Sequence, residues 1–241
     1  MSDNVEPVVE LKDVDVVYDS GVYALEPVTL DIYDGDFVGV IGPNGSGKST
    51  LLKAIMGYLK VFDGRIHFKE KDITSLRTVE RTRMGMAYIP QLENVFPSLT
   101  VQETLEMGGY SLGKQEMKKE VNSMFDLFPV LRDKKSMKVA TMSGGQRQML
   151  AMARALMVRP TLILLDEPSA GLSPKMSEQV FEKISEIATT GTSMIIVEQD
   201  AEQSLAISGR GYVLAMGEKA FEGSAETILK HEKIREAYLG G

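Results

Sequence analysis

The sequence of 241 residues contains no cysteine, no tryptophan and only two histidines. The absence of cysteine excludes disulfides, thiolate metal ligands and a cysteine nucleophile. His67 and His231 lie far apart in the sequence, which argues against a histidine metal site and against a histidine-containing catalytic triad. The longest stretches without Asp, Glu, Lys or Arg have about 11 residues, whereas a bilayer-spanning helix needs about 20. We therefore expect a chain that does not cross a membrane by itself.

Basic residues are fewer than acidic ones: 27 Lys and Arg stand against 34 Asp and Glu, a formal net charge of −7. This balance weighs against nucleic acid as the main partner. The first ten residues lack the basic and apolar regions of a secretory signal, so we expect no such signal. The hydrophobic fraction of 43% and charged fraction of 25% are typical of a globular domain with a packed core.

The hydrophobic pattern predicts an α/β fold. Short β-rich segments, several of them continuous apolar runs, predict strands at residues 8–17, 28–33, 37–41, 162–165, 194–197, 211–216 and 219–222. Asp34-Gly35 has the sequence of a hairpin turn. A helix is expected at 49–59, and another from Ser173-Pro174 onwards.

The middle of the chain has helical patterns instead. Thr100 to Glu103 form a capping box before a helix that Gly108-Gly109 ends. Ser143 is a possible cap for an Ala- and Met-rich helix that stops before Pro160, and its methionines are expected to fill the core. The chain is thus read as a single domain, 1–241, with core lobes 1–91 and 159–241 and a helical subdomain at 92–158.

The sharpest motif is GPNGSGKST, which matches the P-loop pattern G-x-x-x-x-G-K-[ST] between a predicted strand and a predicted helix. Its glycines let successive backbone N–H groups face one anion at the start of the helix. Lys48 would reach the β- and γ-phosphates, and the Ser49 hydroxyl would ligate Mg²⁺. The predicted nucleotide-binding residues are Gly42, Pro43, Asn44, Gly45, Ser46, Gly47, Lys48, Ser49 and Thr50.

Two acidic residues follow the apolar run Leu162 to Leu165. Asp166 is placed to act through the Mg²⁺ shell, and Glu167 to orient and deprotonate an attacking water. Alone, this pair could equally be two solvated acids at the end of a strand. Together with the P-loop, it indicates nucleotide hydrolysis.

A third motif, TMSGGQRQML at 141–150, could by itself be an ordinary helix cap. Between a P-loop and LILLDEP, it resembles the signature motif of ABC-type ATPases, and the resemblance covers nearly the whole chain. Gln91 matches the family's Q-loop, and 168–173 lies where its D-loop stands. Tyr18 is positioned like the aromatic residue that stacks on adenine, with strand packing as the alternative.

The resemblance implies an ABC-type cassette: a P-loop NTPase with a RecA-like core, an N-terminal antiparallel β part and an inserted helical subdomain. Two cassettes would pair head to tail, homo- or heteromerically, so that each ATP meets one P-loop and the partner's signature motif. The implied signature contacts are Ser143, Gly144, Gly145 and Gln146. The implied metal ligands are Ser49, Gln91 and Asp166, and the implied catalytic residues are Lys48, Glu167 and Gln199.

Departures from the superfamily pattern narrow the resemblance. In the switch segment that follows the predicted strand at 194–197, the superfamily usually has His where this chain has Gln199. Ser173 stands where the D-loop usually has Asp, and Met142 stands where the signature motif usually has Leu. Segments such as EPSAGLSP, VEQDA and AYLGG resemble one ATPase subunit of high-affinity branched-chain amino acid importers, in which these switch and D-loop residues are normal. That subfamily often has Glu at the position of Gln91. Gln199 cannot carry a proton but can hydrogen-bond a γ-phosphate.

The resemblance therefore implies a MgATP hydrolase at the cytoplasmic face of a membrane, powering uptake of branched-chain or related amino acids. Its implied partners are a second ABC ATPase subunit, transmembrane permease subunits and, indirectly, an external solute-binding protein. A permease coupling helix would bind near 91–100 and the helical subdomain. Three alternatives remain: an importer of urea or short amides, a non-transport ABC ATPase acting on DNA or ribosomes, and a pseudo-ATPase. The single cassette disfavours the second, and Lys48 with Glu167 disfavours the third.

Overall fold

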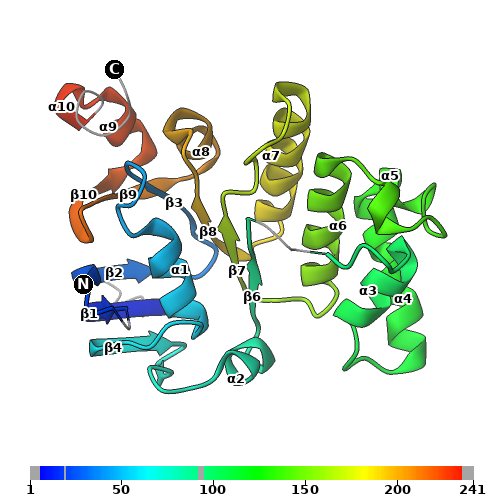
Figure 1. Cartoon of the computed structure of the whole chain (residues 1–241), viewed down its shortest axis with the longest axis horizontal. Coiled ribbons are helices and arrows are strands. Elements are labelled where there is room, and N and C mark those ends of the chain that lie inside the picture. Colours follow the sequence, from blue (N-terminus) through cyan, green and yellow to red (C-terminus); the bar gives the residue numbers. More distant parts are fainter. Residues whose placement is uncertain (1–5, 19, 92–94, 235–241) are drawn as a thin grey trace.

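The computed structural model describes residues 6–18, 20–91 and 95–234. The AYLGG motif at 237–241 lies outside the described residues, as do positions 92–94 of the expected permease-binding region. Among the described residues, no helix is long and apolar enough to span a bilayer. The strands form two separate sheets, and a group of helices lies beside the larger one (Figure 1).

The smaller sheet is antiparallel and has the order β2-β1-β4-β5. Its strands are β1 (Val9–Val17), β2 (Tyr23–Ile32), β4 (Asp63–Phe68) and β5 (Lys71–Asp72). Along β1, buried and more exposed side chains broadly alternate, as expected for a strand with one face on the core. The buried face packs with α1 (Lys48–Met56) in one hydrophobic cluster, so this sheet supports the helix that follows the P-loop.

The larger sheet has the order β10-β9-β3-β8-β7-β6 and is parallel except for β10. Its strands are β3 (Phe37–Ile41), β6 (Met86–Ile89), β7 (Leu162–Asp166), β8 (Ser193–Val197), β9 (Arg210–Ala215) and β10 (Glu218–Ser224). All five residues of β3, of β7 and of β8 are buried, which explains their continuous apolar sequences. The carboxyl ends of the parallel strands share one edge, so the loops after β3, β6, β7 and β8 meet there.

The helices surround this sheet and extend to one side of it (Figure 1). They are α1, α2 (Thr78–Arg83), α3 (Val101–Gly108), α4 (Lys114–Leu127), α5 (Pro129–Arg132), α6 (Gly144–Leu156), α7 (Pro174–Ala188), α8 (Ala201–Ile207), α9 (Ala225–Lys230) and α10 (Glu232–Ile234), with a 3₁₀ turn at Val139–Thr141. Both expected capping boxes are present, at Thr100 before α3 and at Ser143 before α6. Methionines 142, 149, 152 and 157 are buried, as predicted.

The fold confirms the predicted α/β class with its antiparallel N-terminal sheet, but two local predictions need correction and some elements were not predicted. Asp34-Gly35 makes a tight turn without making a hairpin, because β2 and β3 belong to different sheets. The first helix ends at Met56 rather than at 59, since Gly57 adopts a left-handed φ of 80° and caps it. The elements β4, β5 and α2 had no counterpart in the prediction, because charged residues dominate 63–83 and obscure the periodicity.

Arg81 fixes the C-terminal end of α1. Its side chain is only 1% exposed, and its guanidinium donates to the carbonyl oxygens of Ala54, Ile55, Thr74 and Leu76 at 2.7–3.0 Å. Two of these carbonyls lie in the last turn of α1, where backbone oxygens have no partner within the helix and the helix dipole favours a cation. One buried side chain therefore anchors the helix whose other end forms the P-loop.

Candidate functional site

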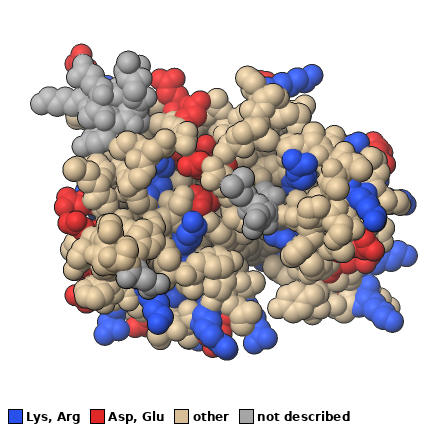
Figure 2. Space-filling model, viewed as in Figure 1, with Lys and Arg blue, Asp and Glu red and all other residues tan. Residues whose placement is uncertain are grey.

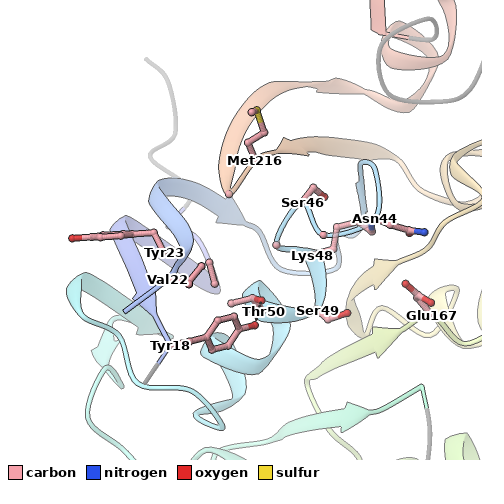
Figure 3. Close-up of a pocket in the computed structure, with 14 residues that line it drawn as sticks. Tyr18, Val22, Tyr23, Asn44, Ser46, Lys48, Ser49, Thr50, Glu167 and Met216 are labelled. Atoms are coloured by element: carbon pink, nitrogen blue, oxygen red, sulfur yellow. Dashed lines mark hydrogen bonds between the residues drawn. The ribbon is translucent and has the colours of Figure 1, made fainter. Parts of the chain in front are cut away.

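The P-loop connects β3 to α1 and lines a cavity of about 420 Å³, here called the P-loop cavity (Figure 3). Its walls consist of Tyr18, Val22, Tyr23, Ala24, residues 44–50, Glu167, Met216 and Gly217. Two glycines are required by space and conformation. A Cβ at Gly42 would lie 2.1 Å from the Leu214 oxygen, and one at Gly47 would lie 2.8 Å from the Ala24 oxygen, with φ values of 151° and 98°.

Lys48 is the cation of this cavity. It is 5% exposed, and its Nζ donates to the carbonyl oxygens of Gly42 and Pro43 at 2.7 and 3.0 Å. Burial lowers the pKa of Lys48, and the negative charges of Glu167, Asp166 and Glu198 oppose that shift. A charged ammonium beside the first N–H groups of α1 forms a binding site for a polyphosphate.

Ser49 lines the cavity and is hydrogen-bonded to Asp166 at the end of β7. The Ser49 hydroxyl donates to Asp166 Oδ1 at 2.6 Å, and the Tyr88 hydroxyl donates to Oδ2 at 2.7 Å. A hydroxyl and a carboxylate are hard oxygen ligands, which fits a Mg²⁺ that takes its remaining ligands from phosphates and water. No cluster of three or more acidic or histidine side chains able to hold a metal occurs in the described part of the chain.

Tyr88 is a site residue that sequence reasoning missed. Its hydroxyl is a hydrogen-bond donor to Asp166, and burial together with the Asp166 charge raises the pKa of Tyr88 well above its usual value. The hydroxyl therefore stays protonated and keeps donating. The available signal was a polar tip inside the otherwise apolar run that forms β6, three residues before Gln91.

Glu167 follows β7 in the left-handed region, with a φ of 45°, and it lines the P-loop cavity on the same side as Ser49 (Figure 3). Such a conformation is unfavourable for a residue with a Cβ and occurs where surrounding contacts impose it. Here the Glu167 N–H donates to the Val197 oxygen at 2.8 Å. Gln91 Nε2 donates to Glu167 Oε2 at 2.8 Å, so the structure places Gln91 against Glu167 rather than in the Ser49–Asp166 pair. Its role as a metal ligand stays a prediction.

The loop after β8 places two further polar residues near the end of β7. Gln199 is exposed, whereas Glu198 is 2% exposed and accepts hydrogen bonds from backbone N–H groups of Ser169 and Gln199. Sequence reasoning gave Glu198 no role, although an acidic residue directly after a buried strand was the available signal. The contribution of Gln199 to hydrolysis stays a prediction.

Tyr18 lies on the wall of the P-loop cavity, and its ring is 43% exposed. Its hydroxyl shares a hydrogen bond with Thr50 Oγ1 at 2.8 Å, which fixes the ring beside the start of α1. Val22, Tyr23 and Met216 line the same cavity. These side chains offer apolar surface to a nucleobase, and stacking on Tyr18 stays a prediction.

The signature segment lies elsewhere in the chain. Ser143 caps α6, and its Oγ accepts from the Gln146 N–H at 3.4 Å. Gly144 lies against Leu172, and Gly145 lies against Met176. A Cβ added at Gly144 would be 3.1 Å from the Leu172 side chain, and one added at Gly145 would be 2.1 Å from the Met176 side chain. Within the described chain, none of the residues 143–146 lines the P-loop cavity. Ser143, at the α6 N-terminus, is itself exposed.

The sequence profile of the ABC transporter family matches residues 25–170. A probable branched-chain amino acid transport ATP-binding protein, LivF, from Archaeoglobus fulgidus is 42% identical over 91% of this chain and 93% of its own length. The high-affinity branched-chain amino acid transport ATP-binding protein BraG from Pseudomonas aeruginosa is 38% identical over 93% and 96%. The lipopolysaccharide export system ATP-binding protein LptB from Acidithiobacillus ferridurans is 34% identical over 88% and 89%.

Solved structures are similar over nearly the full length. The ADP conformation of MJ1267, an ATP-binding cassette of an ABC transporter, has a TM-score of 0.84 at 28% identity and covers 98% of this chain and 99% of that one. The dimeric post-hydrolysis state of the cassette MJ0796, bound to ADP and Pi, has a TM-score of 0.80 at 29% identity over 90% and 98%.

Proposed function

The chain belongs to the ABC transporter family of ATP-binding proteins, and from this premise we propose that it is the MgATP-hydrolysing subunit of an importer for branched-chain or related amino acids. One observation carries the hydrolytic part of this proposal: Lys48, Ser49 and Glu167 line one cavity at the carboxyl edge of the parallel sheet, and Ser49 is hydrogen-bonded to Asp166. Open α/β sheets bind ligands at this edge.

Each of these residues has a separate role in phosphoryl transfer. Lys48 leaves the carbonyl oxygens of Gly42 and Pro43 and binds the β- and γ-phosphates, while N–H groups of the P-loop hold the remaining oxygens. Mg²⁺, when bound, neutralises the charge that develops on the phosphates. Ser49 and Asp166 would hold it, and the Tyr88 hydroxyl orients the Asp166 carboxylate.

Glu167 accepts the proton of the attacking water. Its left-handed backbone places the side chain at the cavity wall, and the Gln91 amide, 2.8 Å from Oε2, holds the carboxylate in one orientation. A carboxylate whose second oxygen is already hydrogen-bonded presents the other oxygen to water.

A complete site requires a second cassette. The first N–H groups of α6, with the exposed Ser143 hydroxyl, form an anion-binding helix end that does not reach the P-loop of its own chain. We infer that it binds the γ-phosphate of ATP held by a partner cassette. The dimeric state described for MJ0796, with ADP and Pi, supports this arrangement.

The permease is proposed to dock in a groove of about 250 Å³ at the lower edge of the molecule in Figure 1, where α2 and the start of β6 lie. Tyr58, Tyr88 and Tyr110 line it, and such aromatic residues commonly anchor interfaces. This groove adds to the region at 91–100 expected from the sequence, of which 92–94 lie outside the described residues.

Arg154 gives this groove a charge preference. It is half-buried, burial lowers its pKa, and no residue in the described ranges supplies an ion pair for it. Figure 2 shows further basic side chains along this lower edge. A carboxylate or a helix C-terminus on the permease segment satisfies these charges, so we expect an apolar segment with acidic character to dock here.

The cargo is inferred from the two relatives whose names state branched-chain amino acid transport. The test is uptake by the reconstituted importer in proteoliposomes loaded with ATP, with leucine, urea and a short amide measured in parallel. We expect leucine uptake that disappears with Lys48→Ala. Uptake of urea or the amide without leucine would move the cargo assignment to that class and leave the ATPase assignment intact.

A further inference from the structure

Glu198 is a buried carboxylate that the steps above do not use. It follows β8 directly and is 2% exposed. Its Oε1 accepts from the Ser169 N–H at 2.8 Å, and its Oε2 accepts from the Gln199 N–H at 3.3 Å. One side chain thus binds the backbones of two different loops.

These two loops surround the proposed general base. Ser169 begins the segment 169–173 that leads from Glu167 to α7, and Gln199 is the residue of the proposed switch. The Glu167 N–H is bonded to the Val197 oxygen at 2.8 Å, and the Ala170 N–H to the Glu167 oxygen at 3.1 Å. The Glu198 carboxylate adds a side-chain connection between the same two loops.

The other end of the segment 169–173 contacts the signature motif. Leu172 lies against Gly144, where an added Cβ would be 3.1 Å from Leu172 Cδ2. A continuous line of contacts therefore runs from the α6 N-terminus through Leu172 and Ser169 to Glu198 and Gln199. In a head-to-tail dimer this line joins the motif that serves the partner's ATP to the residues that serve this chain's own ATP.

The placement of Glu198 is costly for stability. No Lys or Arg in the described part of the chain forms an ion pair with it. Burial raises the pKa of Glu198, against the backbone and side-chain hydrogen bonds of Ser169 and the Gln199 N–H, which lower it; the charge of Glu167 adds a smaller rise. A buried charge without an ionic partner is usually less stable than an apolar side chain of similar size.

We propose that Glu198 is a positioning residue that fixes the position of the segment 169–173 relative to Gln199. Contact of the α6 N-terminus with the partner's ATP then sets the positions of Gln199 and Glu167. This inference rests on the proposed hydrolytic function of the P-loop cavity. Its role is distinct from binding, since Glu198 does not line that cavity.

The test compares Glu198→Gln and Glu198→Leu with wild type in the reconstituted complex, measuring kcat, KM for ATP and the melting temperature. Gln keeps one acceptor oxygen, whereas Leu keeps the approximate volume and removes both. Because hydrogen bonds to a charged acceptor are strong, we expect kcat to fall about 10- to 100-fold in Glu198→Leu and less in Glu198→Gln. KM should stay within about twofold, and the melting temperature of Glu198→Leu should be unchanged or higher.

Glu120→Leu is the matched control. Glu120 is also a buried glutamate, 3% exposed, but it pairs with Arg159 in the helical part of the chain and does not line the P-loop cavity. We expect it to lower the melting temperature and leave kcat unchanged. The inference is overturned if Glu198→Leu keeps wild-type kcat, if its KM alone changes, or if Glu120→Leu loses as much kcat. An inactive wild type would instead overturn the proposed hydrolytic function.

Discussion

The Tyr88→Phe variant tests whether the Tyr88 hydroxyl orients the Asp166 carboxylate for binding Mg²⁺. The change removes one hydroxyl, 2.7 Å from Asp166 Oδ2, and leaves the ring in place. A hydrogen bond to a charged group contributes about 1.5–3 kcal/mol, and loss of such an outer partner commonly lowers metal affinity about 10- to 100-fold. We therefore expect the half-saturating free Mg²⁺ concentration for ATP hydrolysis to rise about 10-fold or more, with kcat at saturating Mg²⁺ nearly unchanged.

The assay is ATP turnover of the reconstituted complex across a free Mg²⁺ titration at saturating ATP. Tyr58→Phe is the control, because its ring lies 5.4 Å from that of Tyr88 and its hydroxyl makes no contact with Asp166. The raised pKa of Tyr88 keeps its hydroxyl protonated, so the rise in the half-saturating Mg²⁺ concentration should have the same size at pH 7 and pH 9. A Tyr88→Phe curve within twofold of wild type, or an equal shift in Tyr58→Phe, would refute this account of the metal site.

Three further predictions concern the buried Arg81, the site shared between two cassettes and the buried Glu198. Arg81→Met removes the guanidinium donor of four carbonyl oxygens, of which that of Ala54 keeps the Gly57 N–H. We therefore expect the free energy of urea unfolding to fall by about 3–4 kcal/mol, against less than about 0.5 kcal/mol for the exposed Arg77→Met, and equal losses would contradict this role of Arg81. The purified chain should hydrolyse ATP at a rate that rises faster than linearly with protein concentration, and Glu167→Gln with ATP should elute as a dimer in size-exclusion chromatography; a high, strictly linear rate at dilute protein would contradict a shared site. Because the folded pKa of Glu198 lies above its unfolded value of 4.5, wild type should lose stability relative to Glu198→Gln as the pH rises from 4.5 through the folded pKa, and a constant difference between the melting temperatures would exclude this.

Local patterns were sufficient to predict the elements that carry the chemistry. The P-loop, the acidic end of β7 and both capping boxes depend on residues within a few positions of one another, so their spacing is visible in the sequence. The same holds for the Met-rich face of α6, whose period places it in the core. Family resemblance then supplied roles that spacing alone leaves open, such as the partner cassette.

The contacts that sequence reasoning missed join distant positions. Tyr88 and Asp166 are 78 residues apart, Arg81 reaches Ala54 across 27, and Glu198 reaches Ser169 across 29. No periodicity relates such pairs, because each depends on how separate elements pack. Asp34-Gly35 illustrates the opposite error: its turn forms as its sequence dictates, but the pairing of the next strand is decided by the buried position of β3 between β8 and β9.

Glu167→Gln tests most directly whether the P-loop cavity hydrolyses ATP. The change replaces one carboxylate oxygen of the proposed general base by an NH₂ group and preserves the size of the side chain. ATP binding and steady-state turnover are measured on the reconstituted complex for wild type and variant. We expect nucleotide affinity within a few-fold of wild type and turnover lowered at least about 100-fold, as loss of a general base typically gives. A variant that turns over ATP as fast as wild type, or a wild type that binds ATP and is as inactive as the variant, would contradict hydrolysis by this cavity.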